Sequence, residues 1–250
     1  RMLERWYARY YLLFGHSLSA RQPVILYANH ADFQQTNVIQ GLISQGVGGV
    51  TEGMKNRVVM PLTGIYREDD HVLGHELVHA FQFDIARQAG GVRRSAASVP
   101  LWFVEGMSEY LTLGHGYPLT SMWMRDAVLR DAVPTIDEVS RDPSYFPYRY
   151  GHAIWSYMTT RWGDEIVGGL MLASFRRGFD GAVREVLGIS TDSLSAGWKK
   201  SVEETWRTGL EERSRPEEVG SEVIRDGGGV NLSPSASPDA AAGDSKIGSP

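Results

Sequence analysis

His75-Glu76-Leu77-Val78-His79 lies within a segment whose apolar residues recur at helical spacing. We predict a helix over residues 70–87, with Asp70 capping its start and an apolar face made by Val72, Leu73, Leu77, Val78 and Phe81. On a helix, residues four positions apart lie on one face, about one turn apart. The imidazoles of His75 and His79 are therefore expected to project side by side.

Two imidazoles in this arrangement are typical metal ligands. Zinc takes nitrogen ligands at about 2.0–2.1 Å, and a rigid helix presents two of them without rearrangement of the chain. Glu76 would lie beside the metal, where its carboxylate can accept a proton from a zinc-bound water whose pKa is lowered to about 7. The pattern thus predicts His75 and His79 as zinc ligands and Glu76 as a catalytic base. The alternative is a helix with two surface histidines.

A catalytic zinc needs a third protein ligand, and Glu105 is the candidate. Tetrahedral catalytic sites combine three protein ligands with a water. Glu105 stands in Trp102-Phe-Val-Glu-Gly-Met-Ser-Glu-Tyr110, within a helix predicted over residues 100–113. If this helix runs antiparallel to the first, the connection over residues 88–99 is long enough to bring Glu105 back over the two histidines.

Three residues near Glu105 also have expected roles at the proposed site. They are a carboxylate that would hold a metal-bound histidine, a glycine between two helices, and a histidine that could replace Glu105 as the third ligand. Glu109 lies one turn later on the same face, and metal-bound histidines usually donate their other N–H to a carboxylate. Glu109 is therefore the expected partner of one histidine, with a solvated helix carboxylate as the alternative. Gly106 is expected to let the two helices approach closely. His115, beyond Gly114 and outside the helix register, is the rival third ligand.

The two quoted stretches together resemble the gluzincin metallopeptidases, especially the peptidase MA-like domains related to thermolysin and to the zinc aminopeptidases. The resemblance implies a zincin-like fold, zinc-dependent hydrolysis of peptide bonds, and Glu105 as the third ligand because it is the Glu before Gly. Thermolysin-like members also place a carboxylate four residues later as a histidine partner. Here that position is Glu109, a Glu where those members have Asp.

The similarity extends over about residues 24–210. Tyr148-Arg-Tyr-Gly-His-Ala-Ile-Trp-Ser-Tyr157 resembles the tyrosine-bearing helix of the family. This resemblance implies that Tyr150 hydrogen-bonds the oxyanion of the tetrahedral intermediate. Tyr148 and His152 are the alternatives for that role, and packing in the helical core is the alternative for the aromatic residues.

The remaining segments predict a small α/β front followed by a mostly helical body. Residues 24–28 are a strand candidate, and residues 57–60, stopped by Pro61, are a second strand that suits a sheet edge. The glycine-rich residues 46–53 lack the ending of a phosphate loop and indicate a turn into a strand. Asp32 is expected to cap a helix that runs through about Ile43. A helix is predicted within residues 2–18, ending near Gly15, and another is predicted to start at Thr135. Four more helices are predicted over residues 150–161, 164–177, 180–187 and 191–213. The predicted fold class is α+β.

Composition and charge exclude several classes of protein. The 250 residues are 42% hydrophobic and 10% aromatic, which suits a globular core. Cysteine is absent, so disulfides, thiolate metal sites and a cysteine nucleophile are excluded. The net charge is −5, from 30 acidic and 25 basic residues, and the sequence has no basic stripe. Nucleic acid is therefore not an expected partner. No window reaches the roughly 18 apolar residues of a membrane span, so no transmembrane segment is expected.

The chain is predicted to divide into a peptidase domain over residues 1–213 and a linker or tail over residues 214–250. The tail is rich in Ala, Gly, Ser and Pro. Its stretch Asn231-Leu-Ser-Pro-Ser-Ala-Ser-Pro-Asp239 is similar to the opening of a repeat in TolB-type β-propellers, with a plain linker as the alternative. That similarity implies a periplasmic or extracellular protein. No signal peptide is visible in the chain, which begins at Arg1.

The sequence therefore predicts a zinc peptidase that acts on a peptide or protein substrate, to which the strand over residues 57–60 could pair. Thr51-Glu52-Gly53 is interpreted as a loop with an acid, and a site that binds a substrate amine, in the manner of aminopeptidases, is the alternative. A rival from another class is a non-catalytic zinc-containing interaction domain that serves an attached β-propeller in the cell envelope. The presence of Glu76 argues against this rival, because a purely structural zinc site does not need a general base. A non-peptidase metal hydrolase is the second rival.

Overall fold

The computed structural model describes residues 1–90, 99–209, 214 and 216–221. The chain divides into two units, Arg1–Leu210 and Glu211–Pro250. The first unit is mostly helical and carries one small mixed sheet, so the α+β class is confirmed. Within the described residues, no helix combines the length and the apolar character needed to cross a membrane.

The sheet has three strands in the order β1-β3-β2. β1 (Val24–Tyr27) pairs in parallel with β3 (Arg57–Pro61), and β2 (Val50–Glu52) pairs antiparallel with the other side of β3. The prediction of residues 57–60 as an edge strand is therefore wrong. β3 is central because its apolar run is buried on both faces, and Pro61 is tolerated because it is the last residue of the strand.

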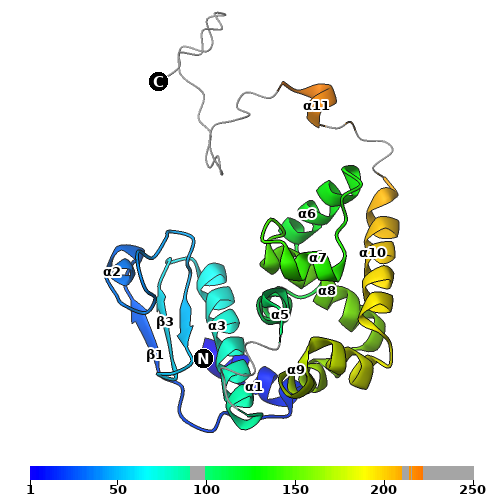
Figure 1. The fold of residues 1–250 in the computed structure, drawn as a ribbon. Coiled ribbons are helices and arrows are strands. Elements are labelled where there is room, and N and C mark those ends of the chain that lie inside the picture. Colours follow the sequence, from blue (N-terminus) through cyan, green and yellow to red (C-terminus); the bar gives the residue numbers. More distant parts are fainter. Residues whose placement is uncertain (91–98, 210–213, 215, 222–250) are drawn as a thin grey trace, which may run out of the picture. The chain divides into compact units, whose positions relative to one another are not determined.

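Helices cover both faces of this sheet (Figure 1). On one face, Phe33 of α2 (His30–Gln34) packs with Ile43 and Val59. The cap of α2 is Asn29, whose side chain accepts a hydrogen bond from the Asp32 backbone N–H, so the prediction of Asp32 as the cap is wrong. α2 also ends well before Ile43, because the chain turns back to bury Ile43 beside Phe33.

The other face of the sheet packs against α3 (Tyr66–Gln88), which carries His75, Glu76 and His79. α3 starts four residues before Asp70, so Asp70 is not its cap. The Asp70 carboxylate instead forms an ion pair with Arg5 and accepts from the Trp6 indole at 3.2 Å, which ties α1 (Met2–Phe14) to α3. α1 ends at Gly15, as predicted, with a left-handed φ of 56°.

The helical body follows α3 and begins with α5 (Leu101–Leu113), whose bounds match the prediction closely. In Figure 1, α3 lies between the sheet and α5. A capping box at Thr135 starts α7 (Ile136–Arg141), as predicted, whereas α6 (Pro118–Leu129) is not predicted although Pro118 at its first turn is a typical start signal. The remaining elements are α8 (Pro147–Trp162), α9 (Ile166–Ala182), a five-residue π-helical turn (Val183–Leu187) and α10 (Thr191–Arg207).

A glycine pair brings α5 and α8 into close contact. A Cβ placed on Gly106 would lie 2.7 Å from the carbonyl oxygen of Gly151, and nearer still to its Cα and carbonyl carbon. The expectation that Gly106 serves the contact between the helices of residues 70–87 and 100–113 is therefore wrong. That contact is tight at Gly74 instead, where an added Cβ would lie 2.8 Å from Thr112.

The second unit contains one short described helix, α11 (Pro216–Val219). The propeller-like stretch 231–239 lies outside the described residues, and so does most of the predicted tail.

Candidate metal centre

Three side chains from α3 and α5 converge on one point. The Nε2 atoms of His75 and His79 are 3.1 Å apart, and Oε2 of Glu105 lies 3.2 Å from the first and 3.3 Å from the second. These three donor atoms form a nearly equilateral triangle, and the residues are a group able to hold a metal ion. The structure thus brings Glu105 to both histidines, as the sequence analysis expected of the third ligand.

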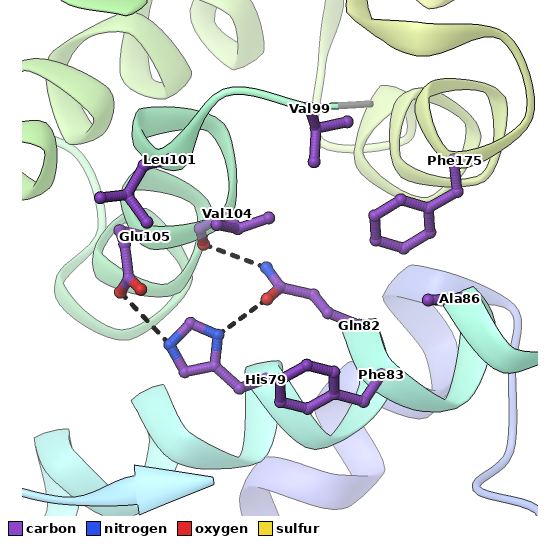
Figure 2. Close-up of a pocket in the computed structure, with 9 residues that line it drawn as sticks. All are labelled: His79, Gln82, Phe83, Ala86, Val99, Leu101, Val104, Glu105 and Phe175. Carbon is purple, nitrogen blue, oxygen red and sulfur yellow. Dashed lines mark hydrogen bonds and ion pairs between the residues drawn. The ribbon is translucent and has the colours of Figure 1, made fainter. Parts of the chain in front are cut away.

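The other ring nitrogen of each histidine is held by a different partner. Nδ1 of His75 donates to Oε1 of Glu109 at 3.0 Å, the contact expected for Glu109. Nδ1 of His79 donates to Oε1 of Gln82 at 2.8 Å, and Gln82 in turn donates to the Val104 carbonyl on α5 (Figure 2). Because both Nδ1 atoms are donors, both Nε2 atoms can offer a lone pair to a metal.

Glu109 is itself anchored by two residues that the sequence analysis did not single out. Nε2 of His71 lies 3.2 Å from Oε1 of Glu109, and the Arg149 guanidinium lies 2.8 Å from Oε2. His71 is one turn before His75 on α3, so its spacing was a usable signal. Arg149 reaches the site from α8, and nothing in the local sequence indicated this contact. Glu109 is 3% exposed, so the interpretation as a solvated carboxylate is wrong.

Glu76 is buried beside the triad and is held by β2. The Thr51 hydroxyl donates to Oε2 of Glu76 at 2.6 Å, and the Glu76 backbone carbonyl lies 2.8 Å from the same hydroxyl. Gly49, just before β2, leaves room for this side chain, since an added Cβ would lie 2.8 Å from Cγ of Glu76. Thr51 therefore orients the candidate base, while the neighbouring Glu52 is occupied by ion pairs with Lys55 and Arg57.

Tyr148, and not Tyr150, lies beside the triad. The Tyr148 ring stacks on His75 with centroids 5.9 Å apart and an interplanar angle of 16°. Burial raises the pKa of the Tyr148 phenol. The charge of Glu105 and a hydrogen bond to this carboxylate raise the same pKa further. The Tyr150 ring packs instead against Trp123 and Tyr145. Two helix positions differ by about 200° around the axis, so the two phenols point to opposite sides of α8.

His152 and His115 both have partners away from the triad. His152 is buried and donates from Nε2 to the Gly114 carbonyl at 2.8 Å, and burial lowers its pKa to about 4. His115, the rival third ligand, contacts the Tyr110 hydroxyl at 2.8 Å and Thr160 at 3.3 Å. Neither imidazole is among the residues that the structure brings to the point where His75, His79 and Glu105 meet.

The histidines and carboxylates of the site strongly shift one another's pKa. Burial alone would raise the pKa of Glu105, but the charge of His79 and hydrogen bonds from both histidines outweigh it and hold this pKa far below its ordinary value. Burial alone would lower the pKa of His75, but hydrogen bonds to Glu105 and Glu109 and the charge of Glu76 raise it to about 10. The two imidazoles and the carboxylates of Glu105 and Glu109 therefore interact closely in a buried place, where the Arg149 guanidinium also lies 2.8 Å from Glu109.

Comparisons with protein-family models, with curated proteins and with solved structures find no match to this chain.

Proposed function

We propose that this protein is a zinc-dependent peptidase with a zincin-like fold, in which His75, His79 and Glu105 bind the metal. The observation that carries the proposal is the triangle of donor atoms, with edges of 3.1–3.3 Å. Zinc with tetrahedral ligands at about 2.0–2.1 Å separates its ligand atoms by about 3.4 Å. Two imidazoles and a carboxylate are also a ligand set that zinc takes in hydrolytic sites. The residues therefore fit the metal in both distance and chemistry.

When bound, zinc would supply Lewis acidity that lowers the pKa of a coordinated water and polarises a substrate carbonyl. Glu76 would take the proton of the attacking water, and the hydrogen bond from Thr51 keeps its carboxylate oriented for this role. The Tyr148 hydroxyl, whose ring stacks on His75, would donate a hydrogen bond to the carbonyl oxygen as it gains negative charge.

β2 is the better candidate for binding an extended peptide, since β3 is the central strand. β2 pairs with β3 on one side and stands at the end of the strand order. It also carries Thr51, the partner of Glu76, so a peptide added along its outer edge would pass close to the proposed base. Export to the periplasm or cell surface, and attachment to a β-propeller, remain proposals from the similarity of residues 231–239.

Replacement of Glu76 by Gln tests the proposal, because it keeps the size of the side chain and leaves the metal ligands untouched. Glu68→Gln is a matched control, an exposed acid on the same helix. We expect both variants to bind one zinc per chain, measured by elemental analysis. Hydrolysis of a mixed peptide library should fall by roughly 10²–10⁴-fold in Glu76→Gln alone. Tight zinc binding without cleavage by the wild type would favour the non-catalytic interaction domain.

A further inference from the structure

A cavity of about 300 Å³ lies between α6, α8 and α10, on the far side of α5 from the sheet (Figure 1). Exposed residues such as His115 and Thr160 also line it, so it is open to solvent. None of the described residues that line it belongs to the candidate metal centre. Each of the three helices contributes two lining residues one turn apart, which are Thr120 and Met124, His152 and Ser156, and Val202 and Trp206.

Three polar atoms of the residues that line this cavity are buried and have no hydrogen-bond partner among the described residues. They are Nδ1 of His152, Oγ1 of Thr120 and Oγ of Ser156. Nε2 of His152 donates to the Gly114 carbonyl at 2.8 Å, and burial lowers the pKa of this imidazole to about 4. The ring is therefore neutral near pH 7, and its Nδ1 carries a lone pair that can accept a hydrogen bond. Each of the two hydroxyls can both donate and accept.

The remaining walls of the cavity restrict the charge of a ligand. Met124, Val202 and Trp206 offer apolar surface, and none of the described residues that line the cavity is an aspartate, glutamate, lysine or arginine. A charged ligand would lose its hydration here without gaining an ion-pair partner. A neutral ligand with an apolar body would gain free energy from leaving water, and a polar group on it could pair the three buried atoms, whose unpaired state costs free energy.

We propose that this cavity binds a small neutral molecule that combines an apolar body with a hydroxyl group. The hydroxyl would donate to Nδ1 of His152 and accept from Ser156 and Thr120, while the body packs against Met124 and Trp206. The volume lies at the small end of the range of about 300–1,000 Å³ for ligand sites, which suits a single ring or a short chain. The site is independent of the proposed peptidase function, because it shares no residue with the metal ligands or with Glu76.

Binding of p-cresol to the full-length protein tests the proposal. Two further probes are p-xylene, which has nearly the same shape without the hydroxyl, and p-toluate, which carries a charged carboxylate in its place. The protein carries ¹³C-labelled methionine methyl groups, and the resonances of Met124 and Met122 are assigned by replacing each residue with Leu. Met122 is the control, because it lies on the same helix at 51% exposure and does not line the cavity. We expect Met124 to shift and Met122 to stay unchanged, with p-cresol bound about tenfold more tightly than either other probe, the effect of a buried hydrogen bond.

Removal of the unpaired hydroxyls should weaken the binding of p-cresol without harming the fold. Thr120→Val and Ser156→Ala each delete a hydroxyl that has no partner among the described residues. We expect each variant to bind p-cresol at least threefold more weakly, and to be no less stable than the wild type in urea unfolding without the probe. Thr159→Val is the matched control, since Thr159 is buried on α8, donates to the Trp155 carbonyl at 2.9 Å and does not line the cavity. Its affinity for p-cresol should equal that of the wild type, and if one hydroxyl variant does not fold, the other decides.

Either of two results would overturn the proposal. In the first, the Met124 resonance does not move when p-cresol is added up to its solubility. In the second, p-xylene or p-toluate binds as tightly as p-cresol, and both hydroxyl variants bind p-cresol like the wild type. The three buried polar groups would then be paired by water alone, and the cavity would not recognise a hydroxyl.

Discussion

Replacement of Gly106 by Ala should destabilise the protein, although Ala normally stabilises a helix interior. An Ala Cβ at this position would lie 2.7 Å from the Gly151 carbonyl oxygen and closer to two further backbone atoms. Since ordinary contacts begin near 3.5 Å, α5 and α8 would have to separate by roughly 1 Å. No side-chain rotation can relieve the collision, because the atoms on α8 belong to the backbone.

The magnitude follows from two opposing effects. Overpacking costs about 1–3 kcal/mol, and this site belongs near the upper end because backbone meets backbone. Exchange of Gly for Ala within a helix contributes about 0.5–1 kcal/mol in the other direction. The expected net loss in free energy of unfolding is about 2 kcal/mol, which corresponds to a fall in Tm of roughly 4–8 °C for a domain of this size.

Gly169→Ala is the matched control for this substitution. Gly169 also lies inside a helix, α9, but an added Cβ there would lie 3.8 Å from the nearest atom, on Val186. We expect Gly169→Ala to raise the stability by about 0.5–1 kcal/mol. Both variants should be unfolded in urea at a fixed zinc concentration, and again in EDTA, because a bound metal shifts the apparent stability. Equal stability of the two variants would refute the close contact of α5 with α8.

Three further predictions concern pH, the phenol at the site and the ligands. Burial alone would raise the pKa of Asp84, but hydrogen bonds from Ser19, His16 and Arg87 lower it to about 2. The contribution of the ionised Asp84 to the free energy of unfolding is therefore present above pH 4 and lost as the pH falls through 2. Wild type should therefore lose about 2 kcal/mol more than Asp84→Asn in urea unfolding between pH 5 and pH 2, and parallel curves would contradict this role. Tyr148→Phe should lower kcat on the order of 10²–10³-fold while Tyr150→Phe leaves it nearly unchanged, and steady-state kinetics showing the reverse order would restore Tyr150. Glu105→Ala should remove most of the zinc, whereas Glu109→Ala should weaken zinc affinity by roughly 10–100-fold in a competition titration with a chelator. Stoichiometric zinc in Glu105→Ala would end the assignment of the third ligand.

The sequence by itself was sufficient for the parts of the site that depend on local periodicity. His75, Glu76 and His79 share a helix, so their relative positions follow from 3.6 residues per turn. Glu105 and Glu109 are likewise one turn apart on α5, and the helix starts at Pro100 and stops at Gly114 as the capping signals indicate. Apolar spacing also predicted the α+β class and the strands β1 and β3.

The tertiary structure alone decided which distant elements meet. Whether Tyr148 or Tyr150 faces His75 depends on how α8 is rotated about its axis, and that rotation is set by the packing of Gly151 on Gly106. The order of the strands, and with it the position of Thr51 beside Glu76, depends on which edge of β3 each neighbour pairs with. Periodicity describes one element at a time, whereas these choices are determined by contacts between segments far apart in the chain, where steric fit and buried polar pairing decide the outcome.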